Sequence, residues 1–382
     1  MARSCLLLAV LLLWAPAPGC SAPRPPAREI VAYVFPQDSR LQPGQIDAQS
    51  LTRINYAFAN IADGRIVKGF SHDDENYAFL VGLKKENPSL TVLASVGGWL
   101  WSTNFSDVSL TRQSRQVFIQ SVMEFLDNYH LDGLDIDWEF PNSPGAGHPY
   151  RAEDKQNFTL LIKELRARFN KRTSRTHTHL YLTIAAGADN DFLANTEMPK
   201  VQRFLDAVNV MCYDYYEPGS EPTTGNHAPL FVDPADPRKV SADASIDAYL
   251  NAGVPAHKIV LGMPFYGHVW GEVSETNHGL FQAGKPVPHA WANFSAVPDM
   301  LKQGYVRYWD SAASVPFLYN AGMKVFVSYE DPQSVAAKCS YVISHKLGGV
   351  MFWEYTNDPS GTLLHAIRDS FHAQSDRSAA KQ

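Results

Sequence analysis

Short runs of apolar, β-branched and aromatic residues recur along the chain and are separated by stretches with helical spacing. Eight such runs lie at residues 30–35, 53–59, 90–96, 133–140, 180–186, 207–213, 259–265 and 349–355. Near-continuous apolar runs, as opposed to strict alternation, are typical of parallel strands that are buried on both faces.

Amphipathic helical patterns occupy several of the intervals. Val117 and Val122 lie along one apolar stripe of residues 114–129, residues 155–170 repeat such a stripe, and residues 334–346 precede the last run. Eight strands that alternate with helices predict an α/β fold, a (β/α)8 TIM barrel. A doubly wound open sheet is the alternative, but no GxGxxG turn follows the first run.

The interval between the seventh and eighth runs is far longer than an ordinary βα loop. Residues 268–324 are rich in Gly, Pro and aromatic residues without a long helical period, which predicts a small α+β insertion. Such an insertion would rise from the C-terminal rim, where TIM barrels carry their active sites. The barrel is then expected to comprise residues 28–267 and 325–372, followed by a polar tail at 373–382.

The N-terminus has the pattern of an export signal. Arg3 precedes an apolar run at residues 5–14, and small residues and prolines follow, which predicts a signal peptide over residues 1–22. No stretch reaches the ~18 consecutive apolar residues that a membrane span needs. We expect a secreted protein, extracellular or periplasmic; lipid anchoring through Cys20 is an alternative.

Composition argues against several other classes of protein. The 382 residues are 45% hydrophobic and 19% charged, and a net charge of -6 without a basic cluster disfavours a nucleic-acid partner. Beyond the leader only Cys212 and Cys339 remain, and we expect two separate buried thiols, with one disulfide as the alternative. No metal, cofactor or second subunit is expected.

The sequence DGLDIDWEF at residues 132–140 places acids where strand propensity disfavours them. Alternation directs Asp135, Asp137 and Glu139 towards the barrel axis and the apolar residues between them towards the helices. Closely stacked carboxyl groups cannot all ionise, so at least one pKa must rise, as a general acid requires. The alternative is an ion-pair network, but Arg53 is the only inward cation on the predicted strands.

These acids resemble the DxxDxDxE signature of glycoside hydrolase family 18, the chitinase family. The signature is matched by Asp132, Asp135, Asp137 and Glu139. Motifs of the third, sixth, seventh and eighth strands of that family are similar to SVGGW at 95–99, MCYDYY at 211–216, MPFYG at 263–267 and FWEY at 352–355. The likeness covers residues 29–372.

The resemblance implies retaining, substrate-assisted hydrolysis of chitin or another N-acetylglucosamine-containing oligosaccharide. Glu139 would protonate the glycosidic oxygen and later activate water, while the substrate's own acetamido carbonyl forms an oxazolinium ion. Asp137 would orient the acetamido N–H and share a proton with Asp135. Tyr213 would bind the acetamido oxygen, and Asp132 would hold the strand.

A second set of residues is expected to bind the substrate. Trp353 would stack under a sugar, Trp99 would extend the groove, and Gly98 would let the backbone approach the ligand. The full set is Trp353, Trp99, Tyr33, Phe58, Gly98, Met211, Asp214, Tyr266 and Trp270. Plain packing is the alternative for the aromatic residues.

Two other functions remain open. Endo-β-N-acetylglucosaminidases that act on N-glycans or peptidoglycan use similar sugars. A catalytically silent chitin-binding lectin is disfavoured because Glu139 and Asp137 are both present.

Overall fold

The computed structural model describes residues 28–379, so the predicted signal peptide and Cys20 lie outside the described part of the chain. Within residues 28–379, no helix combines the length and the apolar character needed to cross a membrane. Cys212 and Cys339 are both buried and unpaired, which confirms the expectation of two separate thiols.

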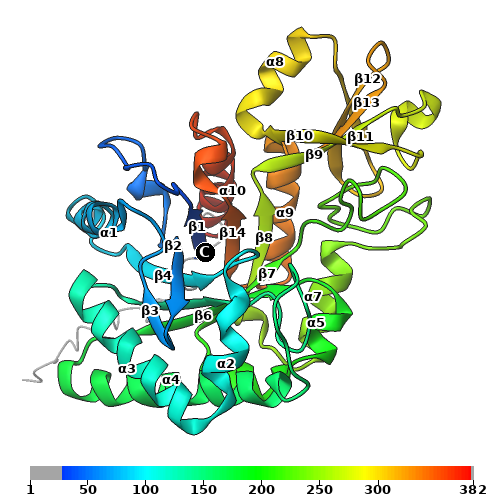
Figure 1. Ribbon diagram of the computed structural model, residues 1–382. Coiled ribbons are helices and arrows are strands. Elements are labelled where there is room, and N and C mark those ends of the chain that lie inside the picture. The colour runs from blue at the N-terminus through cyan, green and yellow to red at the C-terminus, as the bar shows by residue number, and fades with distance from the viewer. Residues whose placement is uncertain (1–27, 380–382) are drawn as a thin grey trace, which may run out of the picture.

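Eight parallel strands close into a barrel (Figure 1). They are β1 (Glu29–Val34), β2 (Arg53–Ala62), β4 (Thr91–Gly97), β5 (Gly133–Asp137), β6 (Tyr181–Gly187), β7 (Ala207–Met211), β8 (Ile259–Pro264) and β14 (Gly349–Trp353). Each strand pairs with the next, and β1 pairs with both β14 and β2, which closes the cylinder. The short strand β3 (Arg65–Val67) adds to β2 in an antiparallel hairpin. The predicted (β/α)8 barrel is confirmed.

Helices connect the strands and surround the barrel. They are α1 (Asp73–Gly82), α2 (Phe105–Leu110), α3 (Arg112–Tyr129), α4 (Asp154–Thr176), α5 (Asn190–Ala194), α6 (Met198–Val201), α7 (Ala242–Asn251), α9 (Pro332–Ser344) and α10 (Thr362–Ala379). Because α10 continues to Ala379, the polar segment predicted to begin at residue 373 is helical over most of its length.

Helix α3 shows how local sequence sets an element and its buried face. It begins at Thr111, whose hydroxyl accepts the backbone N–H of Ser114 in a reciprocal capping box. Phe118 and Val122 are buried, whereas the Val117 side chain is 40% exposed. The predicted stripe was therefore wrong at Val117, because the helix turns Phe118 towards the barrel.

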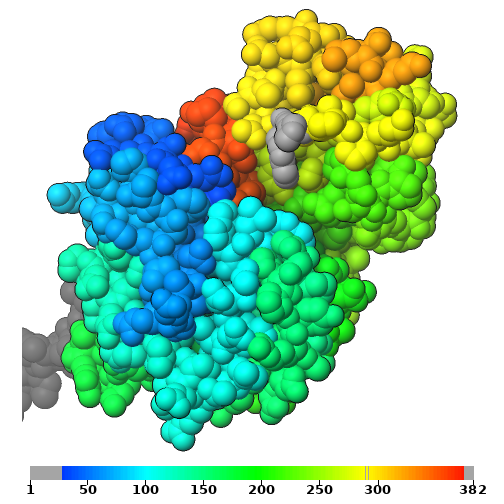
Figure 2. All heavy atoms as spheres, in the orientation of Figure 1, coloured from blue at the N-terminus to red at the C-terminus, as the bar shows by residue number. Residues whose placement is uncertain are grey.

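The insertion forms a second sheet on one side of the barrel mouth, drawn yellow to orange in Figures 1 and 2. Its antiparallel strands run in the order β10 (Lys285–Asn293), β9 (Tyr266–Gly271), β13 (Val325–Ser328), β12 (Val315–Asn320) and β11 (Val306–Asp310), with the short helix α8 (Val297–Lys302) beside them. The sheet is wider than the expected segment 268–324, because β9 and β13 pair with each other at its centre.

The β5 strand separates two apolar environments. Leu134, Ile136 and Trp138 belong to the core between barrel and helices, and Trp138 stacks on Phe105 at a ring separation of 5.2 Å. A smaller cluster fills the interior of the barrel. The predicted alternation, with apolar residues outward and acids inward, is confirmed for the strand itself.

We predict that Phe118→Ala lowers the free energy of unfolding by about 3–5 kcal/mol, because it leaves a cavity in the core between α3 and the barrel. The adjacent Val117→Ala shortens a side chain that is 40% exposed and should cost about 1 kcal/mol or less. Urea unfolding monitored by circular dichroism measures both. Equal losses would show that α3 does not present Phe118 to the core.

Candidate active site

Asp135 lies in a polar layer that crosses the barrel interior. Strand register places Ser95 and Thr183 on either side of it. Its carboxylate accepts hydrogen bonds from Ser95 Oγ at 2.8 Å, Thr183 Oγ1 at 2.5 Å, Tyr33 OH at 2.9 Å and Asn209 Nδ2 at 3.2 Å. Burial raises the pKa of Asp135, and the hydrogen bonds from Thr183, Ser95 and Tyr33 oppose that rise.

Asp137 is the next inward residue on β5 and is only 3% exposed. Its Oδ1 atom is buried and has no hydrogen-bond partner among the described residues. Burial, followed by the charges of Glu139 and Asp135, raises the pKa of Asp137 well above its ordinary value. A buried carboxyl oxygen without a partner is costly, so it is a place where a polar group of a ligand would be stabilised.

Glu139 lies just beyond the strand, because β5 ends at Asp137 and not at residue 140 as predicted. The Glu139 backbone N–H donates to Ser102 Oγ at 3.0 Å, and that hydroxyl donates to the Gly98 carbonyl at 2.9 Å. Burial raises the pKa of Glu139 to about 8, and the negative charges of Asp214 and Glu217 act in the same direction. Glu139 therefore keeps its proton at neutral pH.

Gly97 and Gly98 are required for close packing at the end of β4. Gly97 and Gly98 both have positive φ, +109° and +87°. A Cβ atom at Gly97 would lie 2.2 Å from the Asp137 carbonyl oxygen, and one at Gly98 would lie 2.5 Å from the Phe58 ring. These glycines let the end of β4 pack against β5 and Phe58, and the approach of a ligand to the Gly98 backbone stays a prediction.

Trp353 lies on a base of aromatic rings at the end of β14. Its indole stacks on Phe58 at 5.4 Å with an interplanar angle of 19°, and it contacts Phe35 at 5.4 Å and Tyr33 at 5.8 Å. Phe58 and Tyr33 are buried, so they hold Trp353 in place and present little surface of their own.

Three other predicted residues lie around Trp353 or along the rim. Met211 and Tyr213 pack, partly buried, against the same interior cluster, and the Tyr213 hydroxyl lies 4.0 Å from Met351 Sδ. Trp99 is 50% exposed beside Phe140, so its ring is available to a ligand.

Asp214 is the centre of a second polar cluster, just after β7. The Tyr266 hydroxyl donates its single hydrogen to the Asp214 carboxylate, 2.6 Å from Oδ1 and 2.7 Å from Oδ2, and Oδ1 also lies 2.8 Å from His268 Nε2. Burial alone would raise the pKa of Asp214, but His227 and His268 outweigh it and hold the pKa well below the usual range. Asp214 is therefore an anion at neutral pH.

Two predicted residues serve the scaffold. Trp270 is fully buried and packs edge-on against Phe326 within the second sheet, so its predicted place on the groove wall was wrong. Asp132 accepts hydrogen bonds from Lys84 Nζ at 2.6 Å and from the Val92 N–H at 2.7 Å. Its expected role in holding the strand is confirmed.

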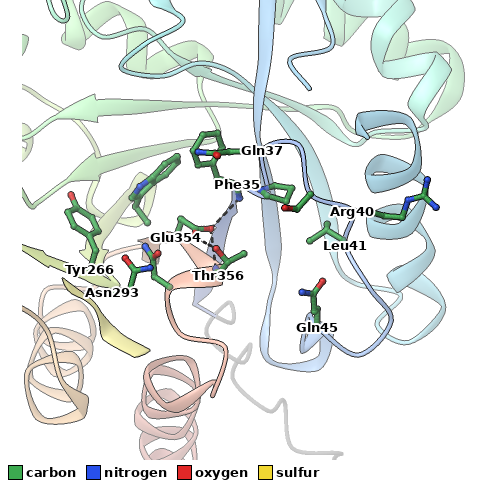
Figure 3. A pocket seen from close by; sticks show the side chains of 13 residues that line it. Phe35, Gln37, Arg40, Leu41, Gln45, Tyr266, Asn293, Glu354 and Thr356 are labelled. Atoms are coloured by element: carbon green, nitrogen blue, oxygen red, sulfur yellow. Dashed lines mark hydrogen bonds between the residues drawn. The ribbon is translucent and has the colours of Figure 1, made fainter. Parts of the chain in front are cut away.

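A groove of about 590 Å³ adjoins this site (Figure 3). Its lining comprises Phe35, Pro36, Gln37, Ser39, Arg40, Leu41, Gln45, Tyr266, Asn293, Trp353, Glu354, Thr356 and Asn357. Trp353 and Tyr266 thus belong both to the site and to the groove, whereas the β5 acids are not part of the lining. The groove extends the site from Trp353, and the insertion contributes Asn293 to it.

Several polar residues at the site were not predicted from the sequence. They are Thr183, Asn209, Ser102, Glu217, His227 and His268. Thr183 and Asn209 carried a usable signal, because each is a polar residue inside an apolar run that was expected to be a buried strand. The others lie in loops or in the insertion, where the sequence pattern does not define their neighbours.

Residues 29–358 match the profile described as Glycosyl hydrolases family 18. The chain is 36% identical to chitinase A1 of Niallia circulans over 85% of its own length, and it spans about half of that longer protein, 55%. It is 32% identical to chitinase 1 of Aphanocladium album over 84% of this chain and 79% of that protein.

A solved structure with a similar fold is the family 18 N-acetylglucosaminidase of Paenibacillus barengoltzii. It is 38% identical, with a TM-score of 0.81 over 90% of this chain and 99% of that one.

We predict that the contribution of Glu139 to the stability of the protein falls as pH rises from about 4.5 to about 8. The folded state holds a proton on Glu139 in this range that the unfolded chain releases, so raising the pH favours unfolding. Glu139→Gln cannot titrate and should lose less stability over the same range. Thermal unfolding across this pH range measures the difference, and Glu124→Gln on the surface of α3 is the control, which should follow wild type. A decline as steep in Glu139→Gln as in wild type would assign the effect to other groups.

Proposed function

The chain belongs to glycosyl hydrolases family 18, and we propose that it is a chitinase-type enzyme that cleaves β-1,4-linked N-acetylglucosamine polymers or oligomers with retention of configuration. The observation that carries the proposal is the place of Glu139 at the barrel mouth, where burial raises its pKa to about 8, next to Asp137, whose Oδ1 has no partner among the described residues. Export under the signal predicted at residues 1–22 is part of the same proposal, because a polymeric substrate must be met outside the cell.

In the first step Glu139 acts as the general acid. Its proton passes to the glycosidic oxygen as the bond from that oxygen to the anomeric carbon breaks. The substrate's 2-acetamido oxygen attacks the anomeric carbon from the opposite face and closes a five-membered oxazolinium ring. The enzyme therefore needs no nucleophile of its own, and the sugar supplies the bond that a second carboxylate would otherwise form.

Asp137 is suited to control the acetamido group during this step. Its unpartnered Oδ1 would accept the acetamido N–H, which turns the carbonyl oxygen towards the anomeric carbon. As positive charge develops on the ring, a shift of the Asp137 proton towards Asp135 would leave an anion beside it. The hydrogen bonds that already surround Asp135 determine how readily it takes that proton.

In the second step Glu139 acts as the general base. Now ionised, it takes a proton from a water molecule whose oxygen attacks the anomeric carbon and opens the oxazolinium ring. Two inversions at one carbon restore the original configuration. Tyr213 would hold the acetamido oxygen, and Asp214, anchored by Tyr266, would contact the sugar.

Aromatic surfaces would position the chain of sugars. The half-buried Trp353 offers a ring fixed by Phe58 and Phe35, on which the apolar face of a sugar can stack. The exposed Trp99 offers a second surface near Phe140. The groove beyond Trp353 has room for further sugar units.

An N-acetylglucosaminidase is the second candidate, because a structure of that description matches over 99% of its length. It would use the same acid and the same acetamido chemistry on a different substrate, such as an N-glycan core or peptidoglycan. A silent lectin is the least supported alternative, because Glu139 and Asp137 are both in place.

We predict that Glu139→Gln lowers kcat on chitohexaose by roughly 10²–10⁴-fold, because it removes the proton that the leaving oxygen needs. Binding of the oligosaccharide should be largely retained, and wild-type activity should fall above pH 8 as Glu139 ionises. Turnover assays and calorimetric binding measure the two effects, with Glu124→Gln as the control. Equal loss of turnover and binding would assign Glu139 to binding instead of proton transfer.

We predict that the wild-type protein releases shorter N-acetylglucosamine oligomers from chitohexaose and leaves a high-mannose glycopeptide intact. A groove that continues past Trp353 favours a linear chain over a branched glycan. Mass spectrometry of both digests measures the outcome. Cleavage of the glycopeptide alone would replace the chitinase assignment with that of an endo-β-N-acetylglucosaminidase.

A further inference from the structure

Three side chains of metal-binding type meet at the C-terminal end of β7. One ligand atom from each of Asp214, His227 and His268 can be chosen so that all three lie within 4.8 Å of one another. They come from separate parts of the fold: Asp214 follows β7, His227 lies in the long loop before α7, and His268 is on β9. We propose that they form a site for a tetrahedral transition-metal ion, Zn²⁺, and that its occupation inhibits the enzyme.

His227 is the observation that separates this cluster from an ordinary hydrogen-bonded triad. Its side chain is completely buried, yet neither ring nitrogen has a hydrogen-bond partner among the described residues. Nδ1 lies 3.5 Å from Asp214 Oδ1, beyond good hydrogen-bond geometry. An unsatisfied buried polar group is destabilising, and a coordinate bond to a metal ion would offset that cost.

The backbone of the site is fixed independently of any ion. The His227 N–H donates to Ser328 Oγ at 2.9 Å, and its carbonyl accepts the Tyr215 N–H at 3.1 Å. Ser328 is on β13 and is the register partner of His268 on β9. Two of the three ligands are therefore positioned by one pair of strands, so little ordering is needed on binding.

The distances suit a small tetrahedral ion. Donor atoms of a tetrahedral Zn²⁺ with bonds of about 2.0 Å lie roughly 3.3 Å apart. The Asp214 Oδ1 atom is 2.8 Å from His268 Nε2 and 3.5 Å from His227 Nδ1, on either side of that value. Two imidazoles and one carboxylate are also a ligand set that zinc uses in catalytic sites. To bind the ion, His268 Nε2 must be unprotonated, so the neutral ring would carry its proton on Nδ1.

The site opens towards the groove. The Asp214 side chain is 35% exposed, whereas those of His227 and His268 are 0% and 6% exposed. An ion can therefore enter past the carboxylate. Asp214 also accepts the hydrogen bond of Tyr266, a groove-lining residue, and directly follows Tyr213. Binding of Zn²⁺ to Asp214 would neutralise the carboxylate and change its contact with Tyr266, at the place where sugar is expected to bind.

The test uses the chelator-treated full chain, titrated with ZnCl₂ in a calorimeter. We expect one Zn²⁺ per chain, a higher thermal midpoint with the ion bound, and the visible absorption of tetrahedral Co²⁺ when CoCl₂ replaces it. His227→Gln and His268→Gln should each weaken Zn²⁺ binding by roughly 10-fold or more. The matched control is His179→Gln, another histidine paired with an aspartate, Asp206, elsewhere in the fold.

Undiminished binding in both His227→Gln and His268→Gln, or no saturable binding by the wild type, would overturn the site. If His227→Gln fails to fold, the His268→Gln titration and the Co²⁺ spectrum of the wild type decide. The inhibition arm rests on the proposed function and is read as slower chitohexaose turnover with added Zn²⁺. Zn²⁺ binding without any turnover of chitohexaose would refute that function and leave the metal site standing.

Discussion

The burial of carboxyl groups one above another, on β5 and just beyond it, is the constraint on which the rest of the barrel interior depends. Charged carboxylates are poorly stabilised away from water, so the protein must neutralise them, surround them with donors, or both. It does both at different heights. Asp135 receives four hydrogen bonds, which oppose the rise of its pKa, whereas Asp137 has an oxygen without a partner among the described residues. The hydrogen bonding of these carboxyl groups is therefore less complete at Asp137 than at Asp135, in the direction of the barrel mouth.

The residues of the neighbouring strands account for this difference between Asp135 and Asp137. Small or polar side chains at Ser95, Thr183 and Asn209 provide the donors at the level of Asp135. At the next level, Gly97 leaves room for the Asp137 carbonyl, where any side chain would collide. The outward residues of the same strand pack against helices, with Trp138 stacked on Phe105. One strand therefore stabilises the fold with one face and carries the chemistry on the other.

Much of this could be predicted from the sequence, because alternation in a strand is a strong physical rule. The inward acids, the parallel barrel and the insertion all follow from pattern and spacing. Trp270 could not be placed, because which face of β9 turns inward depends on its pairing with β13. The place of His227 at the site could not be predicted either, because its neighbours come from segments that are distant in the sequence. Contacts between loops depend on tertiary packing that no local pattern specifies.

Where the chain leaves the barrel for the second sheet, a single residue separates the two, since β8 ends at Pro264 and β9 begins at Tyr266. That residue, Phe265, is buried and stacks on Phe352 of β14 with ring centroids 4.1 Å apart. Because the connection is one residue long and that residue is packed in the core, Tyr266 and the side of the groove that it lines are held close to the barrel. The position of this groove wall is therefore set by the barrel itself, and a ligand in the groove would meet Tyr266 at a place that the cylinder determines.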